Sequence, residues 1–295
     1  MRRLVAVGIS CLVVAVAAAC GSSTAAQSGT INVVAGQNFW GSIALHLGGT
    51  KVNVQSVVTD PNTDPHEYES SANDARAFAD AGLVILNGAG YDAWGQKLLD
   101  ANPSSHRQVL NVADLLGKKV GDNPHFWYNP AYVQQVADKI TAEYRSIDAA
   151  DSSYFDQRRS DFTTALKPYQ DRIVEIKRKF AGVKVGSTES IFVDMSGALG
   201  LNLISPVEFM DAVAEGNDPP ASAVVAFQNQ ISGNQIKVLV YNVQTQTAVT
   251  TNIKQLAVAH HVPTVGVSET LPFGAYFEQW QVTQLTSLEN ALNGG

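Results

Sequence analysis

The sequence is poor in cysteine, with only two among its 295 residues, Cys11 and Cys20. Cys11 lies inside an apolar N-terminal run, and Cys20 ends that run. If the chain is cleaved before Cys20, the mature protein keeps that cysteine alone. A disulfide within the mature chain is then excluded, and so is a thiolate ligand in a binding site of the fold.

Positive charge is also scarce. The sequence has 20 Lys and Arg against 27 Asp and Glu, for a net charge of −7. Removal of Arg2 and Arg3 with the N-terminal run gives 18 − 27 = −9, because no acidic residue precedes Cys20. The sequence has no block of Lys and Arg. This lack disfavours nucleic acid and anionic lipid surfaces as partners.

Long apolar runs are missing after the N-terminus. The stretch "MRRLVAVGISCLVVAVAAAC" has two arginines, an apolar run and then small residues, which is the layout of a secretory signal peptide. The apolar run is shorter than the roughly 20 residues that a membrane-spanning helix needs. We therefore expect residues 1–19 to be a signal peptide and the protein to be exported.

The end of this segment resembles a bacterial lipoprotein processing site. Alanines precede Cys20 and the polar "GSSTAAQSGT" follows it, although Ala17 stands where such a site typically has leucine. The alternative is ordinary cleavage elsewhere among the alanines. We expect Cys20 to be lipidated and residues 20–30 to tether the protein to the outer face of the cytoplasmic membrane.

Strand and helix patterns alternate in two blocks. The first block contains the strand patterns "TINVVAG", "VNVQSVV" and "GLVILNG", and its helical patterns include "SSANDARAFADAG", with Ser70 or Ser71 as a candidate cap. The second block contains "KVGSTES", "LNLIS", "IKVLVYN" and "VPTVGVS". This alternation predicts an α/β fold with two lobes, residues 31–149 and 182–295, built on mainly parallel sheets.

The most periodic segment lies between these blocks, at residues 150–181. Apolar residues recur there at steps of three, four or seven, which predicts one long amphipathic helix. Pro168 is expected to kink it. A helix of roughly 30 residues is about 45 Å long, enough to run along both lobes. We expect a stiff connection, since a flexible linker would be rich in Gly and Ser.

Two histidines follow prolines in loops of the first lobe: His66 in "TDPNTDPHEYES" and His125 in "GDNPHFWYNP". A single histidine is more often a hydrogen-bonded structural residue. Two Pro-His pairs after strand patterns are harder to dismiss, because the loops at the carboxyl ends of parallel strands form the ligand-binding edge of an α/β sheet. The prolines and aromatics around His125 would fix the direction of its ring.

The second lobe offers two carboxylates in equivalent loops. Glu189 and Glu269 each come directly after a strand pattern. A lone Glu there is usually a solvated cap, but the apolar surroundings of these two are a poor place for an unpaired carboxylate. Two imidazoles and two carboxylates, two from each lobe, predict a divalent metal site. Nitrogen and oxygen donors without thiolate suit Mn, Fe, Co or Zn.

The polar residues also allow a hydrolase or a receptor for a larger ligand as alternatives. The sequence "HEYES" begins like the zinc-hydrolase motif H-E-x-x-H, but Ser70 stands where the second histidine belongs. A receptor for a larger ligand, such as a metal chelate, would want a pocket rich in Arg or aromatics, which is not evident. The remaining histidines, His46, His106, His260 and His261, are expected at helix ends or in solvated turns.

The chain resembles the metal-receptor lipoproteins of bacterial manganese/zinc ABC importers. The resemblance rests on "DPHEYE", "ADAGLVILNGAGYDAW", "DNPHFWYNP", the long helix, "GSTESIFVDMSGALGL" and "VPTVGVSETLP". It implies two α/β lobes bridged by one rigid helix, with the ligands His66, His125, Glu189 and Glu269 between the lobes. It also implies a monomeric receptor, not an enzyme, that delivers metal to a membrane permease with a cytoplasmic ATPase.

Departures from the commonest family pattern bear on the metal. Relatives specialised for zinc usually have a third histidine where this chain has Glu189, and many have a His-rich loop where this chain has the short "LLGKKVGDNPH". Glu269 stands where Asp is frequent, and Asn242 where Glu is frequent, with no role evident from the sequence. The resemblance thus favours Mn²⁺ over Zn²⁺, with Fe²⁺ as a further candidate.

Overall fold

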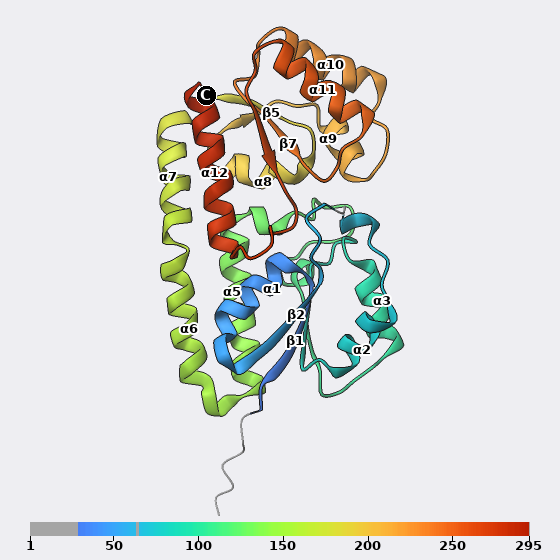
Figure 1. Cartoon of the computed structure of the whole chain (residues 1–295), viewed down its shortest axis with the longest axis vertical. Coiled ribbons are helices and arrows are strands. Elements are labelled where there is room, and N and C mark those ends of the chain that lie inside the picture. Colours follow the sequence, from blue (N-terminus) through green and yellow to red (C-terminus); the bar gives the residue numbers. More distant parts are fainter. Residues whose placement is uncertain (1–28, 63–64, 295) are drawn as a thin grey trace, which may run out of the picture.

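The computed structural model describes residues 29–62 and 65–294, which form two α/β lobes stacked end to end (Figure 1). The expected signal peptide, Cys20 and most of the expected tether lie outside the described residues. Among the described helices, none combines the length and apolar character that crossing a bilayer requires.

Both lobes contain a four-stranded sheet with parallel pairing throughout. The order is β2-β1-β3-β4 in the first lobe and β6-β5-β7-β8 in the second, so the two sheets share one topology. The predicted fold class is confirmed. The strands are β1 (Ile31–Gln37), β2 (Val52–Val58), β3 (Leu83–Leu86), β4 (Gln108–Asn111), β5 (Lys184–Ser187), β6 (Asn202–Leu203), β7 (Leu239–Asn242) and β8 (Thr264–Val267).

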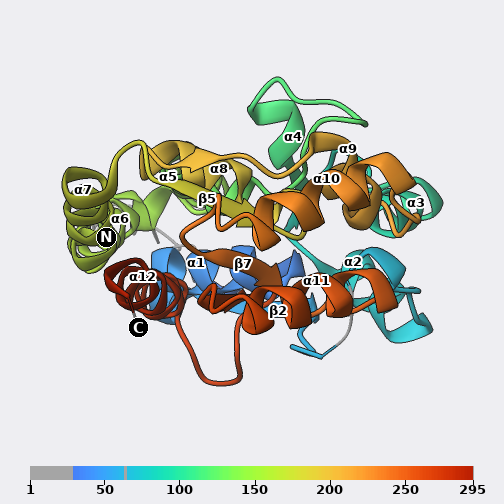
Figure 2. The ribbon, with the colours of Figure 1, turned by 90° about the horizontal axis from the view of Figure 1, so that it is seen from above.

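Helices cover the faces of both sheets. In the second lobe, Leu239 belongs to a hydrophobic cluster with side chains of α10 and α11, and its neighbour Val240 belongs to a cluster with side chains of α12. Figure 2 shows β7 between α12 on one side and α10 and α11 on the other. The helices outside the connection between the lobes are α1 (Asn38–Gly48), α2 (Ala72–Asp80), α3 (Ala93–Ala101), α4 (Val112–Leu115), α5 (Pro130–Ile147), α8 (Val193–Ala198), α9 (Val207–Ala214), α10 (Ala221–Ser232), α11 (Ala248–Ala259) and α12 (Phe277–Asn293).

Local sequence signals explain where several of these helices begin. Ser71 caps α2 in a reciprocal capping box, in which its hydroxyl accepts from the N–H of Asp74 and the Asp74 carboxylate accepts from the N–H of Ser71. Asn129 caps α5, and Pro130 occupies the first helical position, where a missing N–H costs nothing. The prediction of a cap at Ser70 or Ser71 is thus resolved in favour of Ser71.

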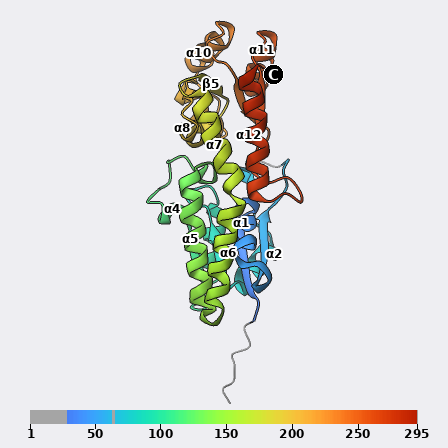
Figure 3. The same cartoon turned by 90° about the vertical axis from the view of Figure 1, so that its left-hand side faces the viewer.

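The predicted single helix between the lobes is two nearly continuous helices, joined at Leu166. They are α6 (Ser152–Ala165) and α7 (Lys167–Phe180). Pro168 has no N–H to donate to the carbonyl of Thr164, so the helical ladder is interrupted there. Leu166 still donates to Phe162 and accepts from Gln170, which keeps the two helices in sequence. Figures 1 and 3 show α6 beside the first lobe and α7 beside the second.

One hydrophobic cluster extends through both lobes. It joins side chains of the first sheet, such as Val33 and Ile85, to side chains of the second, such as Val240, by way of α5, α6, α7 and α12. A continuous core of this kind resists large hinge motion. The expectation of a stiff connection agrees with this arrangement.

Candidate metal centre

The four candidate ligands come from the carboxyl-terminal sides of strands in both sheets. His66 follows β2, and His125 follows β4 after the short α4. Glu189 and Glu269 each lie two residues beyond a strand, β5 and β8 respectively. Because the carboxyl ends of both sheets face the boundary between the lobes, side chains distant in sequence meet at this boundary.

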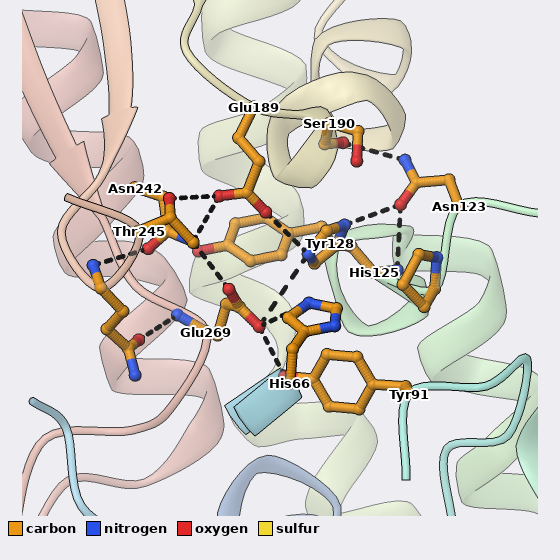
Figure 4. A network of polar contacts seen from close by, with 12 residues as sticks. His66, Tyr91, Asn123, His125, Tyr128, Glu189, Ser190, Asn242, Thr245 and Glu269 are labelled. Atoms are coloured by element: carbon orange, nitrogen blue, oxygen red, sulfur yellow. Dashed lines mark hydrogen bonds and ion pairs between the residues drawn. The ribbon is translucent and has the colours of Figure 1, made fainter. Parts of the chain in front are cut away.

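The structure brings these four side chains together. One ligand atom from each of His66, His125, Glu189 and Glu269 lies within 4.8 Å of the others. His125 Nε2 is 3.2 Å from Glu189 Oε1 and 4.0 Å from Glu269 Oε2, and His66 Nε2 is 3.5 Å from the same Glu269 oxygen (Figure 4). This spacing suits a single ion of first-row size among the four atoms.

Three of the four side chains in the cluster are shielded from solvent, and His66 is the exception. The side chains of His125, Glu189 and Glu269 are fully buried, whereas that of His66 is 24% exposed. A cavity of about 520 Å³ opens beside His66 and reaches solvent; its lining includes His66, Tyr91, Asp122, Asn123, Asp211 and Glu215. An ion that approaches through this cavity meets His66 before the other three residues.

The His125 ring is fixed by its neighbours. Asn123 donates its amide to the Ser190 carbonyl, so its Oδ1 faces His125 and accepts from Nδ1 at 2.7 Å. The Nδ1–H tautomer leaves a lone pair on Nε2, directed at the cluster. The Trp127 ring meets His125 at its edge and stacks on Phe39 at 3.9 Å between ring centroids. The Trp127 contact agrees with the expectation that aromatic residues around His125 fix the direction of its ring.

The pair His125 Nε2 and Glu189 Oε1 lacks hydrogen-bond partners although both atoms are buried. They lie 3.2 Å apart, and no hydrogen bond joins them. Two facing acceptors in a dry site repel each other and carry a desolvation cost. A cation held between them removes both problems, so the donor set fits a bound metal.

The carboxylates are held by donors from two segments, the end of β7 with the residues that follow it and the connection between β3 and α3. Asn242 donates to Glu189 Oε2 at 2.6 Å and to Glu269 Oε1 at 2.7 Å, and the Thr245 hydroxyl donates to Glu189 Oε2 at 2.7 Å. The Tyr91 hydroxyl donates to Glu269 Oε2 at 2.6 Å. These donors hold both carboxylates in place and aim them at the cluster.

The protonation of Glu189 follows from these contacts. Burial is the largest single influence and by itself raises the pKa of this carboxyl. A proton on His125 Nε2, together with the hydrogen bonds from Thr245 and Asn242, outweighs burial and lowers the pKa of Glu189 below its ordinary value. The carboxylate form that a metal requires is therefore the form that the site already favours.

Sequence reasoning missed three residues of this network: Tyr91, Asn123 and Thr245. Asn123 stands two positions before His125, and Tyr91 lies within a quoted motif, so both were in view without an assigned role. Thr245 gave no signal, since a threonine after a strand is unremarkable. Asn242, whose role was open, bridges the two carboxylates.

The other histidines do not join this cluster within the described ranges. His46 lies in the last turn of α1, with Nδ1 3.5 Å from Glu278, and its carbonyl accepts from Arg158. His260 caps the carboxyl end of α11. His106 is exposed. These positions agree with the expectation of helix ends and turns.

The chain spans less than two thirds of the length of the curated relatives that it matches. The manganese ABC transporter substrate-binding lipoprotein PsaA of Streptococcus mitis is 26% identical over 208 residues, which is 64% of this chain and 66% of that protein. The metal ABC transporter substrate-binding lipoprotein ScbA of Streptococcus cristatus is 27% identical over 183 residues, 55% of each.

Solved structures share the fold over nearly the whole chain. The crystal structure of ZnuA has a TM-score of 0.71 at 18% identity and covers 90% of this chain and 99% of its own. The periplasmic zinc binding protein TroA of Treponema pallidum has a TM-score of 0.74 at 14% identity, covering 90% and 98%. At such identities these likenesses concern the fold alone.

A family model completes the comparison and confirms the resemblance inferred from the motifs. The model for the zinc-uptake complex component A, periplasmic, matches residues 33–291, which is most of the chain and includes all four clustered residues. The chain belongs to the ZnuA family of periplasmic zinc-uptake components.

Proposed function

We propose that this protein is the receptor of a bacterial ABC importer for a divalent transition metal. It captures the ion outside the cytoplasmic membrane and delivers it to a membrane permease driven by a cytoplasmic ATPase. The ion binds between the lobes to His66, His125, Glu189 and Glu269. The metal is cargo, and the protein performs no chemical reaction on it.

The observation that carries this proposal is the buried, unbonded contact of His125 Nε2 with Glu189 Oε1, completed by Glu269 and His66. A zinc hydrolase needs an open coordination position and a general base with access to substrate. Here three of the four candidate ligands are fully buried, which suits the binding of an ion as cargo better than catalysis.

Manganese is the favoured cargo, ahead of zinc and iron. Two of the four donors are carboxylate oxygens, which suit manganese better than imidazole does. Relatives at 25–26% identity are described as manganese ABC transporter substrate-binding lipoproteins. Zinc binds more tightly than manganese at most N/O sites, so the cargo also depends on metal supply.

We further propose the organisation of the whole chain. Residues 1–19 are a signal peptide, and 20–30 are a tether with lipid on Cys20 at the outer face of the cytoplasmic membrane. Residues 31–149 and 182–295 are the lobes, and 150–181 connect them in a monomer. Relatives described as lipoproteins support the anchor.

The first experiment is metal analysis of the purified protein, with single alanine variants of the four ligands. We expect one Mn²⁺ or Zn²⁺ per chain, lost on replacement of His125 or Glu189. The second is cellular uptake after deletion of the gene, measured at limiting supply of each metal. Loss of zinc uptake with unchanged manganese uptake would overturn manganese as the cargo.

A further inference from the structure

Asn242 is positioned to act on both carboxylates at once. It ends β7, is 2% exposed, and points its amide between Glu189 and Glu269 (Figure 4). Its Oδ1 accepts from the backbone N–H of Gln244 at 2.9 Å, which fixes the orientation of the amide. The two hydrogens of its NH₂ group are therefore both directed at carboxylate oxygens.

Two hydrogen bonds occupy both lone-pair positions of one Glu189 carboxylate oxygen, Oε2. A carboxylate oxygen has about two lone-pair positions, and Oε2 receives Asn242 at 2.6 Å and Thr245 at 2.7 Å. The other oxygen, Oε1, has no hydrogen-bond partner and faces His125. A metal ion that binds Glu189 through both oxygens would have to displace one of the two donors.

Glu269 is also held by donors. Asn242 donates to its Oε1, and Tyr91 donates to Oε2, the oxygen that faces both imidazoles. The restriction on coordination is clearest at Glu189, where two donors meet on one carboxylate oxygen.

We propose that Asn242 and Thr245 hold Glu189 to binding through one oxygen, and thereby set how the site discriminates between metals. This inference rests on the proposed function. With Glu189 restricted to Oε1, the protein supplies one coordinating oxygen fewer than it would with both Glu189 oxygens bound, and zinc accepts a low coordination number readily. Manganese favours more ligands, so the restriction lowers manganese affinity relative to zinc and opposes part of the preference for manganese that the two carboxylates confer.

The residue type at position 242 matters for this role. An amide donates to both carboxylates without adding charge, whereas a carboxylate at this position would repel them and offer a further oxygen. Thr245 adds the second donor to the same Glu189 oxygen. Asn242 ends β7 and Thr245 lies three positions further along the chain, and both are buried.

The test uses the double variant Asn242→Ala with Thr245→Val, in the mature protein, titrated with Mn²⁺ and Zn²⁺ salts in competition. The ratio of the manganese to the zinc dissociation constant is expected to fall about tenfold, equivalent to about 1.4 kcal/mol. X-ray absorption should show one more oxygen ligand around bound manganese than in the wild type. Thr245→Val alone should give a smaller shift in the same direction.

The matched control is Asn102→Ala with Thr283→Val, which removes an amide and a hydroxyl hydrogen bond to the carbonyls of Leu98 and Gln279, neither of them part of the cluster. It should leave the ratio unchanged. An unchanged ratio and ligand number in the double variant would overturn the inference, and if that variant does not fold, Thr245→Val decides in the same way. A folded wild type that binds neither metal would instead refute the proposed function.

Discussion

At the scale of single residues, the orientation of His125 depends on Asn123. The Asn123 amide oxygen accepts from Nδ1 of His125, and its NH₂ group donates to the Ser190 carbonyl of the other lobe. One side chain therefore fixes the imidazole and joins the lobes at the cluster. Outer groups of this kind determine metal affinity because they orient the ligand before the metal arrives.

Asn123→Ala is expected to weaken metal binding by about 10- to 100-fold, the usual cost of losing a group that orients a ligand. Asn123→Asp should retain most of the affinity, because a carboxylate still accepts from Nδ1–H while the bond to Ser190 is lost. Calorimetric titration of both variants with Zn²⁺ measures the effect. Equal losses in the two variants would show that Asn123 acts through the lobe contact alone.

Glu189 is the residue at which the choice of metal is expected to change. Glu189→His replaces an oxygen donor by imidazole and removes one negative charge, so the variant should bind zinc more tightly relative to manganese. The measurement is the ratio of dissociation constants from competition between the metals. Glu208→His, at an exposed position of the same lobe, makes the same charge change and should leave the ratio as it is. No change in the Glu189 variant would remove the reason for favouring manganese.

At the scale of elements, α7 and α12 are joined by buried charge as well as by apolar packing. The Glu289 carboxylate on α12 accepts from Lys179, at 2.7 Å, and from Arg172, both on α7. The hydrogen bond from Lys179 is the main influence that lowers the pKa of Glu289 below its ordinary 4.5, and Arg172 adds to it against the effect of burial. This contact ties the C-terminal helix to the connection between the lobes.

Glu289→Gln is therefore expected to lower the melting temperature at neutral pH. Because the folded-state pKa is depressed, the stabilisation is complete above about pH 4.5 and is lost as the pH falls through the lower, folded-state pKa. The gap in melting temperature between wild type and variant should thus close in acid below that pH. Thermal melts across this range, with Glu208→Gln as the exposed control, provide the measurement; a gap independent of pH would contradict the ionic origin.

At the scale of the whole molecule, two lobes with one topology place their sheet ends against each other. The first lobe supplies both imidazoles and the second supplies both carboxylates, so neither lobe alone holds a complete site. A bound ion adds a link between lobes that the shared core already holds together. The loaded and empty forms are then expected to differ modestly, enough for a permease to distinguish them.

The attachment of the whole molecule to the membrane is expected to depend on Cys20. Cys20→Ser should move the protein from the membrane fraction to the soluble fraction, because a lipid on this residue would be the only firm anchor. Cys11→Ser changes a cysteine within the expected signal peptide and should leave the distribution unaltered. Fractionation and immunoblotting compare the two, and firm membrane association of the Cys20 variant would point to another contact.

The sequence by itself determined most of the architecture and the four candidate ligands. Strand and helix periods are local, so they predicted the strands around Val33, Val84 and Val240 and the helices between them. Pro-His pairs and glutamates directly after strands are also local signals. The rule that the strands of one parallel sheet present their carboxyl ends together predicted that His66 would lie near His125 in the first lobe. The strand β4 escaped prediction, because it is short and half exposed, with neither an apolar run nor alternation.

Only the tertiary structure decided how these ligands are held. Tyr91 meets Glu269 across 178 residues of sequence, and Thr245 meets Glu189 across 56. Nothing in the local pattern of a tyrosine or a threonine indicates such a partner, since a hydrogen bond of this kind depends on the packing of whole lobes and on side-chain direction. The same packing gave Asn242 its place between two carboxylates. The strand and helix patterns of the sequence therefore indicate which residues lie at the boundary between the lobes. The packing of the lobes decides which atoms of those residues remain available to an ion.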